Sequence, residues 1–149
     1  MKIIFVHHGE KEKAKEDPNL TPFGRKLARR AAFWIREQGI VPENIASTST
    51  KRTIQTAQAI QKEFHEQKLS IALKNIPDSW SDWLCFGEEL FRASPNPWVL
   101  VGHHPTIAMF KEEFRLKISL VTFASVIVLK RDKANHWSFI KQKQGALSL

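Results

Sequence analysis

The sequence predicts an α/β domain: a three-layer sandwich in which helices flank a mostly parallel central sheet. Two short apolar runs, KIIFV at 2–6 and WVLV at 98–101, have the pattern of strands that are buried on both faces. Segments with apolar residues at helical spacing alternate with these runs and with weaker strand candidates along the chain. Such alternation is typical of parallel sheets covered by helices.

A charged loop and then a helix are predicted after the first strand. The loop is EKEKAKEDPN at 10–19, which combines charge with a proline. Thr21 is a suitable N-cap, Pro22 suits the first helical position, and Gly39 supplies a C-terminal stop. The apolar residues at helical spacing between these signals are Leu27, Ala31, Trp34 and Ile35. One face of this helix can therefore cover the sheet.

The middle of the chain predicts a further strand and helix. Residues 44–47 (NIAS) are a brief strand candidate, and an amphipathic helix is expected to begin close to Arg52. Its apolar positions are Ile54, Ala57, Ile60 and Phe64. Residues 69–76 (LSIALKNI) are another strand candidate.

The remaining elements follow a tryptophan-rich segment at 77–93, whose latter part is expected to be helical. Trp80, Trp83 and Phe86 could line a substrate pocket or belong to the core, and their spacing of three residues, which is ordinary helical packing, favours the core. Cys85 is expected to be an inert small hydrophobe. Residues 120–129 and 136–142 are predicted to close the sheet as two strands around a turn.

Length and composition predict one domain spanning residues 1–149, which is enough chain to bury a hydrophobic core without staples. No apolar stretch of about 18 residues is present, and the N-terminus lacks the pattern of a signal peptide. The single cysteine fits a reducing compartment. We therefore expect a monomer in the cytoplasm, without a membrane partner.

The chain is basic, with 23 Lys and Arg against 15 Asp and Glu, and its formal net charge is +8. This charge favours encounter with anions. The basic residues are scattered, however, and the aromatic residues are not interleaved with them in an RNA-binding signature. We expect no nucleic-acid partner; a phosphorylated substrate would use the same positive field.

Three predicted strand ends carry polar side chains that could form one site. His7 and His8 follow the first strand, Arg52 follows the loop after 44–47, and His103 and His104 follow 98–101. Ligands of open α/β sheets bind at the carboxyl ends of the strands. The two histidine pairs are therefore expected to share one rim.

Four motifs in this order resemble the histidine phosphatase superfamily, also called phosphoglycerate mutase-like. They are VHHGE at 6–10, LTPFG at 20–24, STSTKRTIQTA at 47–57 and VGHHP at 101–105. The short chain, the GHHP motif and the tail at 120–142 are most similar to bacterial phosphohistidine phosphatases of the SixA type. The resemblance covers nearly the whole chain and implies the phosphoglycerate mutase-like fold.

The resemblance implies a role for each motif residue. His8 corresponds to the family's nucleophile, and Arg52 and His103 correspond to residues that bind the phosphoryl oxygens, His103 as a second catalytic residue. Gly9 belongs to the same phosphoryl-binding loop. His7 stands where the family has an arginine, and this is the main departure. The implied activity is a phosphatase without metal or other cofactor, acting on protein phosphohistidine or on a small phosphorylated substrate.

The residue types suit this chemistry. An imidazole such as His8 can attack phosphorus when one nitrogen is unprotonated and the other donates to a fixed acceptor. Arg52 offers a planar, permanently charged fork for phosphoryl oxygens, and His103 can donate to them. His7 has an unperturbed pKa of about 6.5, so it would supply less positive charge than an arginine as the pH rises.

The proton donor to the leaving group is not identified by a motif. Relatives with longer chains use a carboxylate in the region where this chain has Asp78, Asp82, Glu88 and Glu89. The imidazole of a phosphohistidine substrate is a relatively good leaving group once it is protonated, so a dedicated acid is dispensable for that substrate. Phosphate monoesters are expected to react more slowly for the same reason.

Two alternatives from other functional classes remain open at this point. In the first, the arginine replacement has impaired catalysis and the protein is a phosphate- or phosphoprotein-binding module. In the second, His7, His8, His103 and His104 bind zinc, copper or nickel, although neighbouring strand residues point to opposite faces. His104 is otherwise expected to pack at the strand end, and His65 and His136 to lie on the surface.

Overall fold

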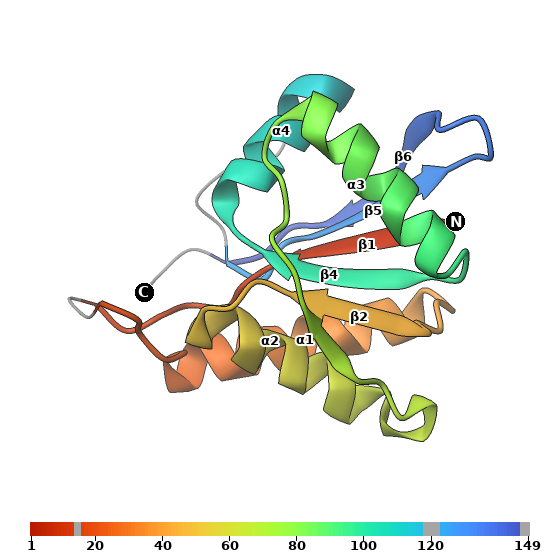
Figure 1. The fold of residues 1–149 in the computed structure, drawn as a ribbon. Coiled ribbons are helices and arrows are strands. Elements are labelled where there is room, and N and C mark those ends of the chain that lie inside the picture. The colour runs from red at the N-terminus through yellow and green to blue at the C-terminus, as the bar shows by residue number, and fades with distance from the viewer. Residues whose placement is uncertain (14–15, 118–122, 147–149) are drawn as a thin grey trace.

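The computed structural model describes residues 1–13, 16–117 and 123–146, and it forms a three-layer α/β sandwich (Figure 1). The six strands are β1 (Lys2–His7), β2 (Asn44–Ser47), β3 (Ile71–Leu73), β4 (Trp98–Gly102), β5 (Val126–Arg131) and β6 (Trp137–Lys143). The helices are α1 (Pro22–Glu37), α2 (Lys51–Glu63), α3 (Trp80–Ala93) and α4 (His104–Phe114), with a 3-10 turn, η1, at His65–Gln67. The predicted fold class is confirmed.

The sheet has the strand order β3-β2-β4-β1-β5-β6. The first four strands in this order run parallel, and β5 and β6 continue the sheet as antiparallel strands. Because β1, β2 and β4 are neighbours with the same direction, their carboxyl ends meet at one edge. This edge carries the motifs that the sequence analysis singled out.

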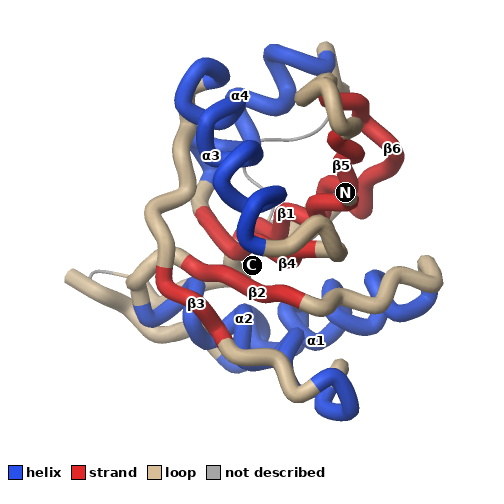
Figure 2. Tube along the Cα trace, turned by 45° about the vertical axis from the view of Figure 1, so that its right-hand side comes forward, coloured by secondary structure: helices blue, strands red, loops and turns tan. Residues whose placement is uncertain are grey.

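Helices cover both faces of the sheet, α1 and α2 on one and α3 and α4 on the other (Figures 1 and 2). Alternate residues of a strand point to opposite faces. Accordingly Ile4 and Val6 belong to the core cluster beneath α1 and α2, whereas Ile3 and Phe5 belong to the cluster beneath α3 and α4. This double burial explains why β1 is a continuous apolar run.

The first helix has the boundaries that its sequence signals predict. The Thr21 hydroxyl oxygen accepts a hydrogen bond from the Gly24 N–H at 2.9 Å, which caps the first turn, and Pro22 follows directly. Beyond the end of the helix, Gly39 has φ = 73°, a left-handed conformation that favours glycine.

The second helix begins at Lys51, close to the predicted start, but its buried face differs from the expectation. Thr53 and Thr56 are fully buried together with Ala57 and Ile60, whereas Ile54 is only partly buried. Helical spacing permits either set of residues to face the sheet. Facing inward, the two hydroxyl groups meet partners in the segments that follow β1 and β2, namely Gly9 for Thr56 and Thr48 for Thr53.

Two strand predictions were longer than the strands themselves. Only three residues of 69–76 pair with β2 as β3. Of the predicted strand 120–129, residues 120–122 lie outside the described residues, and β5 begins at Val126. Ala124, just before it, has φ = 58°, which no extended strand accommodates.

One helix, α4, was absent from the sequence analysis. Pro105 lies in its first turn, and its apolar residues Ile107 and Phe110 are buried against the sheet. This helix follows β4 after His103, so its N-terminus lies at the same edge as the histidine motifs. No helix within the described ranges is long and apolar enough to span a membrane.

The tryptophan-rich segment behaves as expected in α3, with one correction. Trp83 and Phe86 are buried in the core, and Trp80 packs partly buried against the same cluster. Cys85, expected to be an inert small hydrophobe, is exposed and takes no part in the core. It lies one position away from the buried stripe of the helix, so its side chain faces solvent.

Two glycines let the loop after β1 pass directly over α1. A Cβ on Gly24 would collide with the Glu10 carbonyl oxygen, and a Cβ on Gly9 would collide with the Gly24 carbonyl oxygen. The Thr21 N–H also donates to the Glu10 carbonyl at 2.9 Å. Close backbone packing against α1 therefore holds this loop, which follows directly from His8.

We predict that Gly24→Ala destabilises the protein, although alanine normally stabilises a helix interior relative to glycine. Forcing the two backbones apart should cost about 2 kcal/mol in the free energy of unfolding, measured by urea titration. Gly39→Ala is the control, because a Cβ there meets no atom within 4 Å and only the backbone conformation, worth about 1 kcal/mol, is disfavoured. A smaller loss for Gly24→Ala than for Gly39→Ala would contradict the packing argument.

Candidate active site

The two histidine pairs and the arginine are brought together by the register of three parallel strands. His7, the last residue of β1, is level with Gly102 of β4, and Ser47 of β2 is level with Val101 of β4. His8 and His103 therefore emerge from neighbouring strands directly beyond the sheet edge. Their rings lie 5.5 Å apart between centroids.

His8 is buried, and one of its ring nitrogens has a fixed partner. Its Nδ1 lies 2.8 Å from the Gly9 carbonyl oxygen. Because a carbonyl oxygen can only accept, Nδ1 carries the proton and donates it, and Nε2 is left with a lone pair. This Nε2 lies 3.4 Å from Nε of Arg52. The unprotonated nitrogen thus faces the cation rather than the protein interior.

The environment keeps His8 neutral. Burial, the neighbouring His7, and then Arg52 and His103 together lower the pKa of His8 to about 2, although its hydrogen bond to the Gly9 carbonyl acts in the opposite direction. A neutral imidazole is the nucleophilic form. At neutral pH His8 is therefore ready to attack an electrophile placed beside Arg52.

Because His8 is buried in its neutral form, the free energy of unfolding should depend on pH. In the unfolded chain a histidine has a pKa of about 6.5, so below pH 6.5 the unfolded state binds a proton at His8 that the folded state does not. The stability contributed by His8 is complete above pH 6.5 and is lost as the pH falls toward about 2. Between pH 7 and pH 5 the loss should be about 2 kcal/mol.

Urea unfolding at both pH values tests this prediction by comparison with His8→Gln, which has no titrating group. The free energy of unfolding of wild type should fall by more than that of His8→Gln between pH 7 and pH 5. An equal fall in both proteins would show that the imidazole titrates alike in the folded and unfolded states.

Arg52, the second residue of α2, bridges the two histidine rings. Its Nε donates toward Nε2 of His8 and its Nη2 toward Nδ1 of His103, each at 3.4 Å. Both contacts are long for N–H···N hydrogen bonds, so they yield readily to a better acceptor. If an oxyanion bound between the two rings, the guanidinium N–H groups would donate to its oxygens and no longer to the ring nitrogens.

His103 caps α4 and has partners on both ring nitrogens. Arg52 can only donate, so Nδ1 of His103 accepts, and Nε2–H donates to the Thr48 hydroxyl at 2.9 Å. Burial and then the charge of Arg52 lower the pKa of His103. A bound anion would offset both effects and favour a proton on Nδ1, directed at the anion.

Three threonines that the sequence analysis overlooked hold this arrangement. The Thr48 hydroxyl donates to the Thr53 hydroxyl at 2.9 Å, behind His103. The Thr56 hydroxyl accepts the Gly9 N–H at 3.1 Å and donates to the Arg52 carbonyl at 2.8 Å. The signal was present in the threonine-rich loop before Arg52 and in the helical spacing of Thr53 and Thr56.

His7 packs against the ring of the neighbouring His8. Its side chain is buried, its ring meets the His8 ring edge to face at 4.4 Å between centroids, and it stacks on Phe123 at 5.7 Å. Gly9 contributes its backbone, through the hydrogen bonds already described. The predicted site residues His7, His8, Gly9, Arg52 and His103 thus form one cluster.

The other histidines lie apart from this cluster. His104 is the first residue of α4 and lines a pocket on the side toward α3, and His65 and His136 have side chains 82% and 81% exposed, as expected for surface positions. In the part of the chain that the structure describes, no three His, Cys, Asp or Glu side chains are grouped to hold a metal ion. The alternative of a four-histidine metal site finds no ligand set there.

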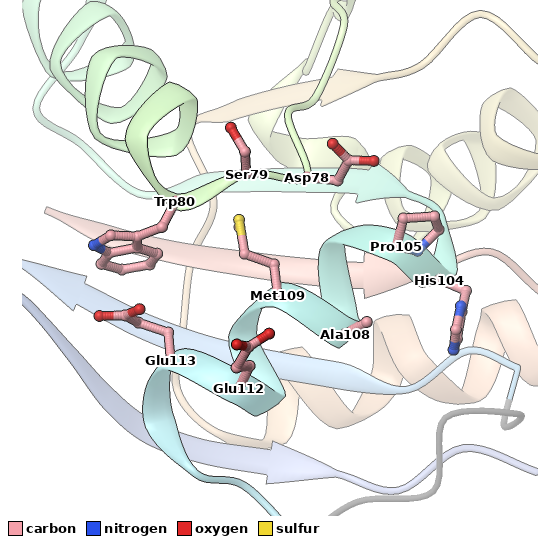
Figure 3. A pocket seen from close by; sticks show the side chains of 9 residues that line it. All are labelled: Asp78, Ser79, Trp80, His104, Pro105, Ala108, Met109, Glu112 and Glu113. Carbon is pink, nitrogen blue, oxygen red and sulfur yellow. The ribbon is translucent and has the colours of Figure 1, made fainter.

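The four carboxylates considered as proton donors have different surroundings. Glu88 pairs with the buried Arg131, and Asp82 accepts a hydrogen bond from the Ser79 hydroxyl at 2.8 Å in the cap of α3. Glu89 is exposed on α3. Asp78 shares the pocket of His104 (Figure 3), so it is the candidate nearest in the fold to the N-terminus of α4.

Comparison with known proteins agrees with this geometry. The family model of the histidine phosphatase superfamily (branch 1) matches residues 3–76. The human 6-phosphofructo-2-kinase/fructose-2,6-bisphosphatase 4 is 35% identical over a 72-residue match that covers 45% of this chain and 15% of that protein. The chain therefore spans only a small part of the curated relatives that it matches.

Solved structures share the fold over nearly the full length. The protein histidine phosphatase SixA complexed with tungstate superposes with a TM-score of 0.81 at 16% identity, covering 97% of each chain. A mycobacterial glucosyl-3-phosphoglycerate phosphatase superposes with a TM-score of 0.71 at 15% identity, covering 97% of this chain and 99% of that one. With the matching family model, the ordered motifs and this shared fold, the chain belongs to the histidine phosphatase superfamily.

Proposed function

We propose that this protein is a phosphatase that removes the phosphoryl group from phosphohistidine on a protein, through a covalent phosphohistidine on His8. The observation that carries the proposal is the state of His8. Its Nδ1 proton is held by the Gly9 carbonyl, and its unprotonated Nε2 faces the Arg52 guanidinium, where an oxyanion would bind. The similarity in fold to a SixA structure complexed with tungstate, a tetrahedral oxyanion, supports the same reading.

In the first step, Nε2 of His8 attacks phosphorus and forms a P–N bond as the P–N bond of the substrate breaks. The electron pair of the broken bond goes to the substrate imidazole, which leaves as a neutral ring when its other nitrogen is already protonated. Charge on the equatorial oxygens is met by the Arg52 fork and by His103.

In the second step, a water oxygen attacks the phosphorus on His8. The P–Nε2 bond breaks, its electron pair returns to the imidazole, and inorganic phosphate leaves with the oxygen of water, whose proton is released. The Gly9 carbonyl holds Nδ1–H throughout and keeps the ring oriented. Positive charge near phosphorus is supplied by protein side chains, so neither step requires a metal.

Phosphohistidine is favoured over a phosphate monoester by its leaving group. An alkoxide needs a proton as it leaves, whereas a protonated imidazole does not. Glu88 and Asp82 are engaged elsewhere, in an ion pair and in a helix cap. A site with a guanidinium placed for an oxyanion, and with two of the four acid candidates engaged elsewhere, suits the P–N bond.

The test is phosphate release at pH 6.5, with a chelator present, from a phosphohistidine peptide and from the corresponding phosphoserine peptide. We expect turnover of the phosphohistidine peptide, with a kcat/KM at least about 10²-fold above that of the phosphoserine peptide. Faster hydrolysis of the phosphoserine peptide would overturn the choice of substrate. Binding of phosphate without turnover of either peptide would favour the binding-module alternative.

The replacement of the family's arginine predicts an unusual pH profile. If charge on His7 assists anion binding, kcat/KM should fall above neutrality, and His7→Arg should raise it by about tenfold at pH 8 and less at pH 6.5. His7→Gln is the matched control, because it is polar but uncharged and should bring no gain at either pH. An unchanged or lower kcat/KM for His7→Arg at pH 8 would contradict a role for this charge.

A further inference from the structure

Beside the phosphoryl-binding cluster lies a pocket of about 550 Å³ that the proposed chemistry does not use. Its walls come from two segments, the entry to α3 and the exposed side of α4 (Figure 3). The side chains that matter to its chemistry are Asp78, Trp80, His104, Met109, Glu112 and Glu113. A volume of this size is typical of sites for small ligands or for parts of larger ones.

The pocket is joined to the cluster through the N-terminus of α4. His103, which contacts Arg52, is the N-cap of this helix, and His104, the next residue, is a wall of the pocket. The Thr106 hydroxyl in the first turn donates to the Pro77 carbonyl at 3.1 Å and fixes the segment that carries Asp78. A phosphoryl group at Arg52 would therefore lie next to the N-cap of α4, and the pocket begins at the following residue, His104.

The charge of the pocket is opposite to that of the chain as a whole. Three carboxylates, from Asp78, Glu112 and Glu113, line it in a protein of net charge +8. Within the described ranges, none of the three has an ion-pair partner or accepts a side-chain hydrogen bond. Their negative charge remains available to a ligand.

The remaining walls suit a chain of methylene groups. Met109 and Trp80 supply apolar surface, and the Trp80 indole is held edge to face against Phe114 at 5.5 Å between ring centroids. A fixed indole beside carboxylates binds a cation on a flexible apolar stem, through cation–π attraction and burial of the stem. Lysine and arginine side chains have this form.

We propose that this pocket selects protein substrates that carry a lysine or arginine side chain close to the phosphorylated residue. The inference rests on the proposed function, because it assigns the position of the phosphoryl group to the His8 and Arg52 cluster. A phosphoryl group at the N-terminal end of α4 and a cation at Glu112 and Glu113, in the last turn of this helix, would then lie about two helical turns apart. The volume of the pocket exceeds what a short aminoalkyl group fills, which favours a peptide over a small phosphorylated amine.

The experiment compares two phosphohistidine peptides that differ only in flanking residues, lysine and arginine in one and glutamate in the other, at low ionic strength. Hydrolysis of phosphoimidazole, which has no flanking residue, is measured with every protein variant. The kcat/KM for each peptide is then divided by the kcat/KM of the same variant for phosphoimidazole. We expect wild type to prefer the basic peptide by about tenfold or more, mostly through KM. The double variant Glu112→Gln with Glu113→Gln should reduce this preference to about twofold.

The control double variant is Glu37→Gln with Glu43→Gln, which changes the net charge equally at exposed positions outside the pocket, so it should keep the preference of wild type. The pocket assignment would be overturned if wild type hydrolysed both peptides with equal kcat/KM, or if the double variant at Glu112 and Glu113 kept the preference for the basic peptide. In either case, turnover of phosphoimidazole would still support the proposed phosphatase activity. Faster hydrolysis of an aminoalkyl phosphate than of the basic peptide would overturn a peptide as the occupant. Failure to hydrolyse phosphoimidazole and both peptides would overturn the proposed function itself.

Discussion

Replacing His8 by asparagine should lower kcat for phosphohistidine hydrolysis by at least about 10³-fold, because the variant has no nitrogen lone pair to attack phosphorus. Wild type mixed briefly with excess phosphohistidine substrate should carry one acid-labile phosphoryl group, which His8→Asn should lack. The expected loss is large because the remaining groups, Arg52 and His103, stabilise charge but form no covalent bond. Rapid-quench labelling and steady-state phosphate release measure both effects.

The matched control is His136→Asn, which makes the same exchange at a side chain 81% exposed to solvent. It should retain the turnover and labelling of wild type. If His8→Asn kept more than a tenth of the wild-type turnover while folded, His8 would not be the nucleophile, and water would have to attack the substrate directly.

Replacing Arg52 by lysine should lower kcat/KM by about 10²-fold despite the conserved charge. In the free protein the guanidinium reaches both imidazoles at once, through Nε to His8 and through Nη2 to His103. A planar fork can turn the same two donors onto two phosphoryl oxygens, whereas an ammonium group offers a single point charge. Arg52→Ala should lose more, about 10³-fold, because it removes the charge as well.

Arg29→Lys, on the exposed face of α1, is the control for a general effect of arginine replacement and should keep the wild-type kcat/KM. Binding of inorganic phosphate separates the two parts of the effect. It should weaken in Arg52→Lys and weaken further in Arg52→Ala. Equal kcat/KM for Arg52→Lys and wild type would show that charge alone, and not the fork, is needed.

Much of the fold could be predicted because its signals are local. The apolar run of β1, the cap at Thr21 and the stop at Gly39 each depend on residues close together in the chain, and each was confirmed. The helix α4 was not predicted because it is short and Pro105 after a strand also suits a loop, so the spacing of Ile107 and Phe110 is a weak local signal. The start of β5 was misjudged because the left-handed backbone at Ala124 has no sequence signal.

The candidate site also contains residues that local sequence signals predicted and residues that they did not. The cluster of His7, His8, Arg52 and His103 was predicted from strand ends and motifs. The threonines behind it were not: Thr56 gains its role from Gly9, 47 residues away in the chain, and Thr53 from the way the preceding loop folds back so that Thr48 meets it. Likewise the acid candidates could be ranked only when Glu88 was found paired with Arg131, 43 residues away in the chain.

The sequence by itself determined the α/β layering, the strand ends that carry the histidine motifs and the resemblance to the histidine phosphatase superfamily, because periodicity, caps and motif order are written in neighbouring residues. Only the tertiary structure decided which nitrogen of His8 is free, how Arg52 is shared between two rings, and that an acidic pocket lies beside a basic site. Those properties depend on burial and on contacts between distant segments, such as that of Thr48 with His103, 55 residues apart. Local patterns predict that the histidines and Arg52 lie at the carboxyl edge of the parallel strands. Packing between distant segments then sets their protonation states and their contacts.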